Sequence, residues 1–142
     1  MFSFVLIFGD QDGEQRIRRS LESLGRVQEE SGGRFVATAA GGPEDGWIAY
    51  QPLSTIEDDF EREEIDALKR SIPGPKFALI EGRDEPKAIF SSSFIIGLSM
   101  QGTALIDNDH GMVATLEVVQ RLAQSGVQWL YLKDSPHCSL DA

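Results

Sequence analysis

Residues 2–8 form a run in which six of seven side chains are apolar, and a polar break follows it directly. The break, Gly9-Asp10-Gln11-Asp12-Gly13, contains the residue types that end strands and open helices. An apolar run of this length, bounded by a turn, predicts a buried β-strand. Residues 14–28 then repeat apolar side chains at helical spacing, which predicts an amphipathic helix packed on that strand.

The spacing of the next segments predicts a specific order of elements. Residues 34–40 and 47–51 are expected to form two strands joined as a hairpin by a loop rich in Gly, Pro and Asp. A capping-box pattern at Ser54 and Glu57 predicts a helix to about Arg70, and residues 76–81 are expected to form a strand. The result is the βαββαβ order of ferredoxin-like domains over residues 2–81.

The remaining residues predict an extension of the same domain. We expect a β-rich unit with a strand at 103–107, one further helix at 111–124 and a final strand at 127–132. Residues 91–100 fit a strand or a short helix, and residues 133–142 are expected to be a surface tail. We therefore expect one α+β domain over residues 1–142, with a largely antiparallel sheet and helices on one face.

Charge and cysteine content narrow the classes of partner. The chain has 23 acidic and 13 basic residues among 142, a formal charge of −10. A nucleic-acid-binding surface needs the opposite sign, so a basic protein or a cation is the expected partner. Cys138 is the only cysteine, which excludes an intramolecular disulfide and indicates a reducing compartment. With no apolar run long enough to span a membrane, we expect a cytoplasmic protein without a membrane partner.

Two Asp-x-Asp turns are candidates for a metal site. Each follows an apolar run and precedes a glycine and a predicted helix. Carboxylates gathered at strand ends can hold a hard divalent cation such as Mg²⁺ or Mn²⁺. The same residues are also typical of helix caps and tight turns. The candidate ligands are Asp10, Asp12, Asp107 and Asp109.

Residues 57–66 are the most acidic stretch, with seven carboxylates among ten side chains. These side chains fall all around the predicted helix, where like charges three and four residues apart oppose helix formation. A solvated helix face accounts for such a cluster, and so does an anionic surface that faces a basic partner. The candidate partner-binding residues are Glu57, Asp58, Asp59, Glu61, Glu63 and Glu64.

No glycine-rich phosphate loop and no nucleophile elbow occurs in the sequence. The leading hypothesis is therefore a non-enzymatic, acidic protein-binding module of the immunity or antitoxin type, which masks a basic partner. One alternative is a metal-dependent enzyme or small-ligand-binding domain that uses the Asp-x-Asp turns. Another is a structural or regulatory domain whose sheet edges pair into a homodimer, so the chain is expected to be a monomer or a homodimer.

Overall fold

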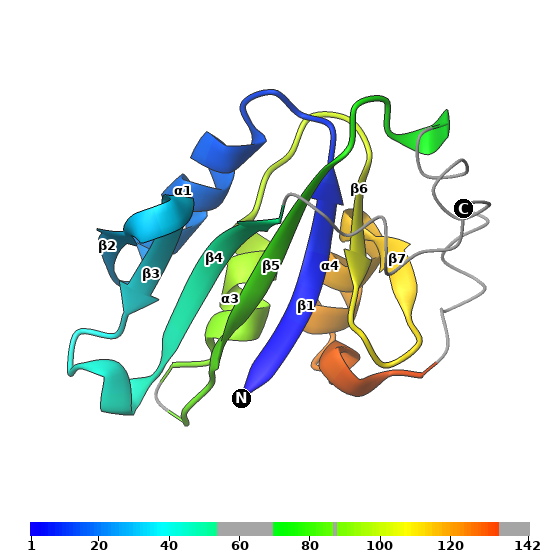
Figure 1. Cartoon of the computed structure of the whole chain (residues 1–142). Coiled ribbons are helices and arrows are strands. Elements are labelled where there is room, and N and C mark those ends of the chain that lie inside the picture. The colour runs from blue at the N-terminus through cyan, green and yellow to red at the C-terminus, as the bar shows by residue number, and fades with distance from the viewer. Residues whose placement is uncertain (54–69, 87, 134–142) are drawn as a thin grey trace.

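The computed structural model describes residues 1–53, 70–86 and 88–133. Seven strands and three α-helices make up this part of the chain, with four successive strands between α1 and α3 (Figure 1). The strands are β1 (Phe2–Phe8), β2 (Arg26–Glu30), β3 (Arg34–Thr38), β4 (Trp47–Leu53), β5 (Lys76–Arg83), β6 (Ala104–Asp107) and β7 (Val113–Thr115). The α-helices are α1 (Gly13–Leu24), α3 (Phe90–Gly97) and α4 (Leu116–Gln124), and the 3-10 turns are η1 (Ser31–Gly33), η2 (Pro43–Asp45) and η4 (Trp129–Tyr131).

All seven described strands form one antiparallel sheet in the order β2-β3-β4-β5-β1-β6-β7. The helices α1, α3 and α4 lie together on one face of this sheet, where α3 contacts both of the others (Figure 1). The prediction of an α+β domain with an antiparallel sheet is thus confirmed. The predicted placement of helices on one face holds for the helices of the described residues.

β1 lies near the centre of the sheet because its sequence buries both faces. Phe4, Leu6 and Phe8 alternate along the strand and point into the helix-covered core, each at most 1% exposed. Ile7 lies on the opposite face and is also 1% exposed. An apolar side chain buried in this way contributes about 1.5–3 kcal/mol to folding, which explains why the most apolar run of the chain is a central strand.

The ferredoxin-like order over residues 2–81 is not confirmed. The strands expected at 34–40, 47–51 and 76–81 are present as β3, β4 and β5, and β3 and β4 form the expected hairpin, with Thr38 opposite Trp47. However, an additional strand, β2, stands between α1 and this hairpin. Residues 54–69, where the second helix was expected, lie outside the described residues.

The helix predicted over residues 14–28 ends at Leu24, and this prediction is wrong for its last turn. Gly25 has an extended backbone, and a Cβ atom there would stand 2.3 Å from the carbonyl oxygen of Thr38. The chain therefore passes close to β3 at Gly25, and Arg26 begins β2. Val27, expected on the helix face, packs against the core from a strand instead.

Three differences concern the second half of the chain. Residues 90–97 are helical, which settles the ambiguity at 91–100, and the Asp84 carboxylate accepts hydrogen bonds from the backbone N–H (2.9 Å) and the hydroxyl of Ser91 in the first turn. The helix expected at 111–124 begins only at Leu116, because the preceding residues pair with β6 as β7. The strand expected at 127–132 is instead the turn η4, in which Trp129 is fully buried.

Two further findings bear on the remaining expectations. Within the residues that the structure describes, no helix is long and apolar enough to cross a membrane. The tail expected at 133–142 lies outside the described residues from position 134 onward.

Candidate functional site

The candidate partner-binding residues Glu57, Asp58, Asp59, Glu61, Glu63 and Glu64 lie outside the described residues. The described strands nevertheless fix where this segment leaves and rejoins the sheet. Leu53, the last residue of β4, pairs with Phe77 near the start of β5. In the same register Phe8, at the end of β1, pairs with Lys76. The acidic segment is therefore inserted at the end of the sheet that also carries the turn after β1.

That turn is organised by Asp10, whose side chain is 4% exposed. One carboxylate oxygen accepts a hydrogen bond from the backbone N–H of Asp12 at 2.9 Å. The other accepts one from the backbone N–H of Gln101 at 2.9 Å and contacts Nε of Arg16 at 2.8 Å. Asp10 thus ties the end of β1 to α1 and to the segment that precedes β6, which is a structural role.

Hydrogen bonds stabilise the ionised form of Asp10. The Gln101 N–H lowers the pKa of this carboxyl most, and the Asp12 N–H and the Arg16 guanidinium lower it further, against the opposing effect of burial. Asp12, in contrast, is exposed and precedes α1 without a side-chain cap hydrogen bond. It is therefore the carboxylate of this turn that is free to meet solvent or a partner. An open hollow of about 510 Å³ borders both residues.

The second Asp-x-Asp turn lies at the opposite end of the sheet. Ala104, at the start of β6, pairs with Phe8, whereas Asp107, at its end, pairs with Val5. Asp107 accepts a hydrogen bond from the backbone N–H of Asp109 at 2.9 Å, and Asp109 is exposed with a positive φ of 61°. The antiparallel register therefore separates the two turns, and the four candidate metal ligands do not share one site.

Among the described residues, no three His, Cys, Asp or Glu side chains are placed to hold one metal ion. Both oxygens of Asp10 already accept hydrogen bonds, and Asp12 stands without a third carboxylate beside it. The expectation of Mg²⁺ or Mn²⁺ at the Asp-x-Asp turns thus gains no support from the geometry and stays a prediction to be tested.

Asn108 is a key residue of the second turn that the sequence pattern did not reveal. Its side chain is fully buried and forms four hydrogen bonds. Its amide nitrogen donates to the carbonyl oxygens of Trp129 (2.9 Å) and Leu132 (2.8 Å). Its amide oxygen accepts from the backbone N–H groups of His110 (2.9 Å) and Met112 (3.1 Å). An asparagine between two aspartates is typical of an ordinary turn, so the sequence pattern does not indicate that this side chain is buried and forms four hydrogen bonds.

His110 follows Asp109 in the second turn, and the structure places it on the surface. It is exposed and packs edge-on against the ring of Tyr131, with 5.2 Å between the ring centroids. Tyr131 is itself 52% exposed. The pair forms a small aromatic patch at the Asp107 turn.

Four arginines of the described residues are neutralised by carboxylates of the same chain. Arg34 illustrates this arrangement, because its guanidinium contacts Glu81 at 2.8 Å across the sheet. The pairs are Arg16–Asp10, Arg18–Glu29, Arg34–Glu81 and Arg83–Glu85. The exposed pairs among these, such as Arg18–Glu29, add at most about 1 kcal/mol each to stability. Their main consequence is that the guanidinium groups of these four arginines are paired with carboxylates of the same chain.

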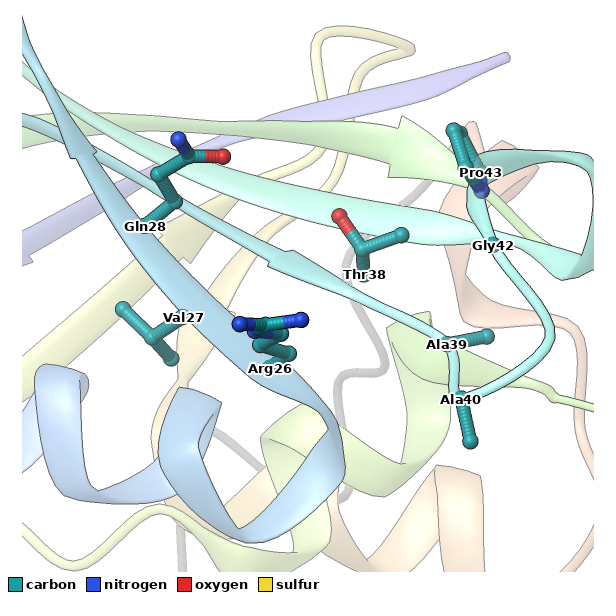
Figure 2. Close-up of a pocket in the computed structure, with 8 residues that line it drawn as sticks. All are labelled: Arg26, Val27, Gln28, Thr38, Ala39, Ala40, Gly42 and Pro43. Carbon is teal, nitrogen blue, oxygen red and sulfur yellow. The ribbon is translucent and has the colours of Figure 1, made fainter.

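A hollow of about 650 Å³, here called the β2-edge hollow, lies at one side of the sheet (Figure 2). It is lined by Arg26, Val27, Gln28, Thr38, Ala39, Ala40, Gly42 and Pro43. Val27 points toward the helices, whereas Gln28 and Thr38 point away from them (Figure 2). The hollow is lined by the start of β2 and by the end of β3 with the loop that follows it, so it lies at the end of this strand pair.

Comparison with known proteins adds no functional information. The chain matches no protein-family model, and it shows no significant similarity to a curated protein or to a solved structure.

Proposed function

We propose that this chain is an acidic protein-binding module whose partner is a basic protein. Its contact residues would be Glu57, Asp58, Asp59, Glu61, Glu63 and Glu64. The most concrete form of the proposal is an immunity- or antitoxin-type protein that masks a basic enzyme such as a nuclease. Such a module needs an anionic surface and a rigid frame to present it, but no catalytic residues.

The observation that carries this proposal is the length and charge of the connection between β4 and β5. These strands are antiparallel neighbours, which about two to five residues suffice to join. Residues 54–75 stand between them instead. Long connections in compact domains are often functional. The connection is thus much longer than pairing of these two strands needs.

The charge of the insertion supports the same conclusion. Residues 54–69 contain seven acidic and two basic side chains, which is half of the formal charge of −10. Asp12 is exposed at the end of the sheet where the insertion leaves and rejoins it. A concentrated negative field at one end of a protein speeds its association with a basic partner and favours that partner over acidic ones.

The test is affinity capture of binding proteins from extract of the source cell, with this protein immobilised. We expect a basic protein to be recovered at about 50 mM salt and to be lost at about 500 mM salt, because screening weakens contacts between exposed charges. The variant Asp58→Asn/Asp59→Asn/Glu61→Gln should lose most of this recovery at low salt. Mixing the identified partner with this protein should then block the partner's own activity.

A matched control removes the same charge elsewhere. Glu44, Asp109 and Glu117 are exposed residues outside the insertion. The variant Glu44→Gln/Asp109→Asn/Glu117→Gln should retain the partner at low salt, although its net charge equals that of the first variant. Equal loss in both variants would mean that net charge alone drives recovery. Recovery of no basic protein, or recovery that salt does not change, would contradict the proposal.

A further inference from the structure

Among the strands that the structure describes, β2 forms one edge of the seven-stranded sheet and pairs with β3 on one side only. Four of its five residues are exposed, so this edge is open to solvent. The other edge, β7, has only three residues and leads directly into α4. An open edge presents backbone N–H and C=O groups to which another strand can pair. Of the two edges, β2 is the one long enough to accept a strand.

The sequence of β2 is complementary to itself in the antiparallel direction. Pairing two copies with Gln28 opposite Gln28 places Arg26 of each copy opposite Glu30 of the other. These three residues lie on the sheet face away from the helices, since Val27 packs against the core. Directly opposed charges of unlike sign stabilise a pair of strands, and a two-fold axis makes the contact occur twice.

The charges also select this register over its neighbours. A shift by two residues in one direction places Glu29 opposite Glu29, which opposes like charges. A shift by two in the other direction places Arg26 opposite Gln28 and removes both ion pairs. Among the described residues, Arg26 has no ion pair within its own chain, so its guanidinium is available for a second copy.

The ends of the paired strands place exposed residues beyond the ion pairs. With Gln28 at the centre, the turn η1 of the second copy follows its Glu30 and lies beyond Arg26. This turn has the sequence Ser31-Gly32-Gly33 and is exposed. The open edge and its charges therefore point to the same occupant.

We propose that two copies of this chain associate by antiparallel pairing of their β2 strands, centred on Gln28. The two sheets then form one continuous sheet with the helices of both copies on the same side. The proposed pairing uses no residue of 54–69, so its test does not depend on whether the acidic insertion binds a basic protein. A five-residue pairing is a small interface, and the dimer is expected to be weak and dependent on concentration.

The experiment measures molar mass by sedimentation equilibrium from about 10 μM to about 1 mM protein, the range in which a small interface associates. The wild type should change from monomer to dimer within it. Arg26→Glu alone and Glu30→Arg alone should each raise the dissociation constant about tenfold or more, because two attractive pairs become two repulsive ones. The double variant Arg26→Glu/Glu30→Arg exchanges the charges and should restore the dimer.

Controls separate this interface from folding and from any other surface. Arg121→Glu reverses an exposed charge on α4 and should leave the dimer unchanged. Circular dichroism and thermal unfolding should show that every variant is folded. Glu30 also contacts Arg34, so Glu30→Arg is the variant whose folding needs this check most. If Glu30→Arg is unfolded, Arg26→Glu and the double variant are sufficient for the test. A wild type that stays monomeric at 1 mM overturns the proposal. So does a dimer that the single reversals leave intact, or a double variant that fails to associate.

Discussion

The carboxylate of Asp10, at the end of β1, accepts a hydrogen bond from the backbone N–H of Gln101, which is 91 residues further along the chain. The bond joins the turn before α1 to the segment between α3 and β6. The bond lies at the end of the sheet at which the acidic insertion leaves β4. Asp10 is therefore a residue that holds the frame of the proposed binding surface, and Asp12 is the exposed carboxylate beside it.

The pKa of Asp10 predicts how stability depends on pH. The folded chain holds this pKa below its ordinary value of 3.8, so the unfolded chain binds the proton more readily. The stability that the ionised carboxylate contributes is complete above pH 3.8 and is lost as the pH falls through the lowered pKa. Asp10→Asn should therefore be less stable than the wild type near pH 7, and this difference should shrink toward about pH 2.

The measurement is urea unfolding of both proteins across this pH range, with Asp12→Asn as the control. Asp12→Asn changes an exposed side chain that makes no cap hydrogen bond, so its free energy of unfolding should stay within about 0.5 kcal/mol of the wild type. A difference between wild type and Asp10→Asn that is equally large at both ends of the range would show that the charge of Asp10 does not contribute.

Addition of divalent cations should leave the melting temperature unchanged. Asp10 and Asp107 lie at opposite ends of the antiparallel β1–β6 pair, and the oxygens of Asp10 already accept hydrogen bonds. We expect about 10 mM Mg²⁺ or about 1 mM Mn²⁺ to shift thermal unfolding by less than about 1 °C, because a ligand stabilises only a chain that binds it. A clear rise that disappears in Asp109→Asn would instead establish a metal site at the second turn.

Asn108 should be among the residues least tolerant of substitution. It is fully buried, and its loss leaves the carbonyl oxygens of Trp129 and Leu132 and two backbone N–H groups without partners. Leaving such groups unpaired in the interior costs stability, so Asn108→Ala should lower the free energy of unfolding by about 2–4 kcal/mol. Chemical unfolding monitored by the fluorescence of buried Trp129 measures this. Asp109→Asn, next to it but exposed, should change stability by less than about 0.5 kcal/mol.

Local sequence patterns predicted the strands whose own residues are apolar enough to indicate burial. β1 is almost wholly apolar, β3 and β5 alternate between buried and less buried positions, and β4 carries the apolar run Trp47–Tyr50, so their own sequences were sufficient. β2 has the sequence Arg-Val-Gln-Glu-Glu, with one apolar side chain in five, and favours a helix on propensity alone. It is a strand because it pairs with β3 across the short turn Ser31–Gly33, and this glycine pair fits the end of a helix as well as a hairpin turn.

Contacts between distant segments limited the prediction of the candidate site. The Asp-x-Asp pattern located both turns correctly in the chain, each after a strand of the sheet. It did not show that β1 and β6 are antiparallel, which places the turns at opposite ends, nor that Gln101 and Trp129 supply the partners of Asp10 and Asn108. The acidic segment was evident from composition, while its insertion between two neighbouring strands required the pairing of β4 with β5.

The predicted helix continues through Gly25, whereas the observed helix ends just before it. Substitution of Gly25 tests whether its close approach to β3 causes this difference. A Cβ atom at this position would stand 2.3 Å from the Thr38 carbonyl oxygen, so Gly25→Ala forces β2 away from β3. We expect a loss of about 1–3 kcal/mol in the free energy of unfolding. In the matched control, Gly97→Ala, the nearest atom is the Ser20 hydroxyl oxygen at 3.8 Å, an ordinary contact, and alanine favours the helix. That variant should be about 0.5 kcal/mol more stable than the wild type in the same urea titration. If Gly25→Ala is as stable as Gly97→Ala, the close approach of Gly25 to Thr38 is not what ends α1.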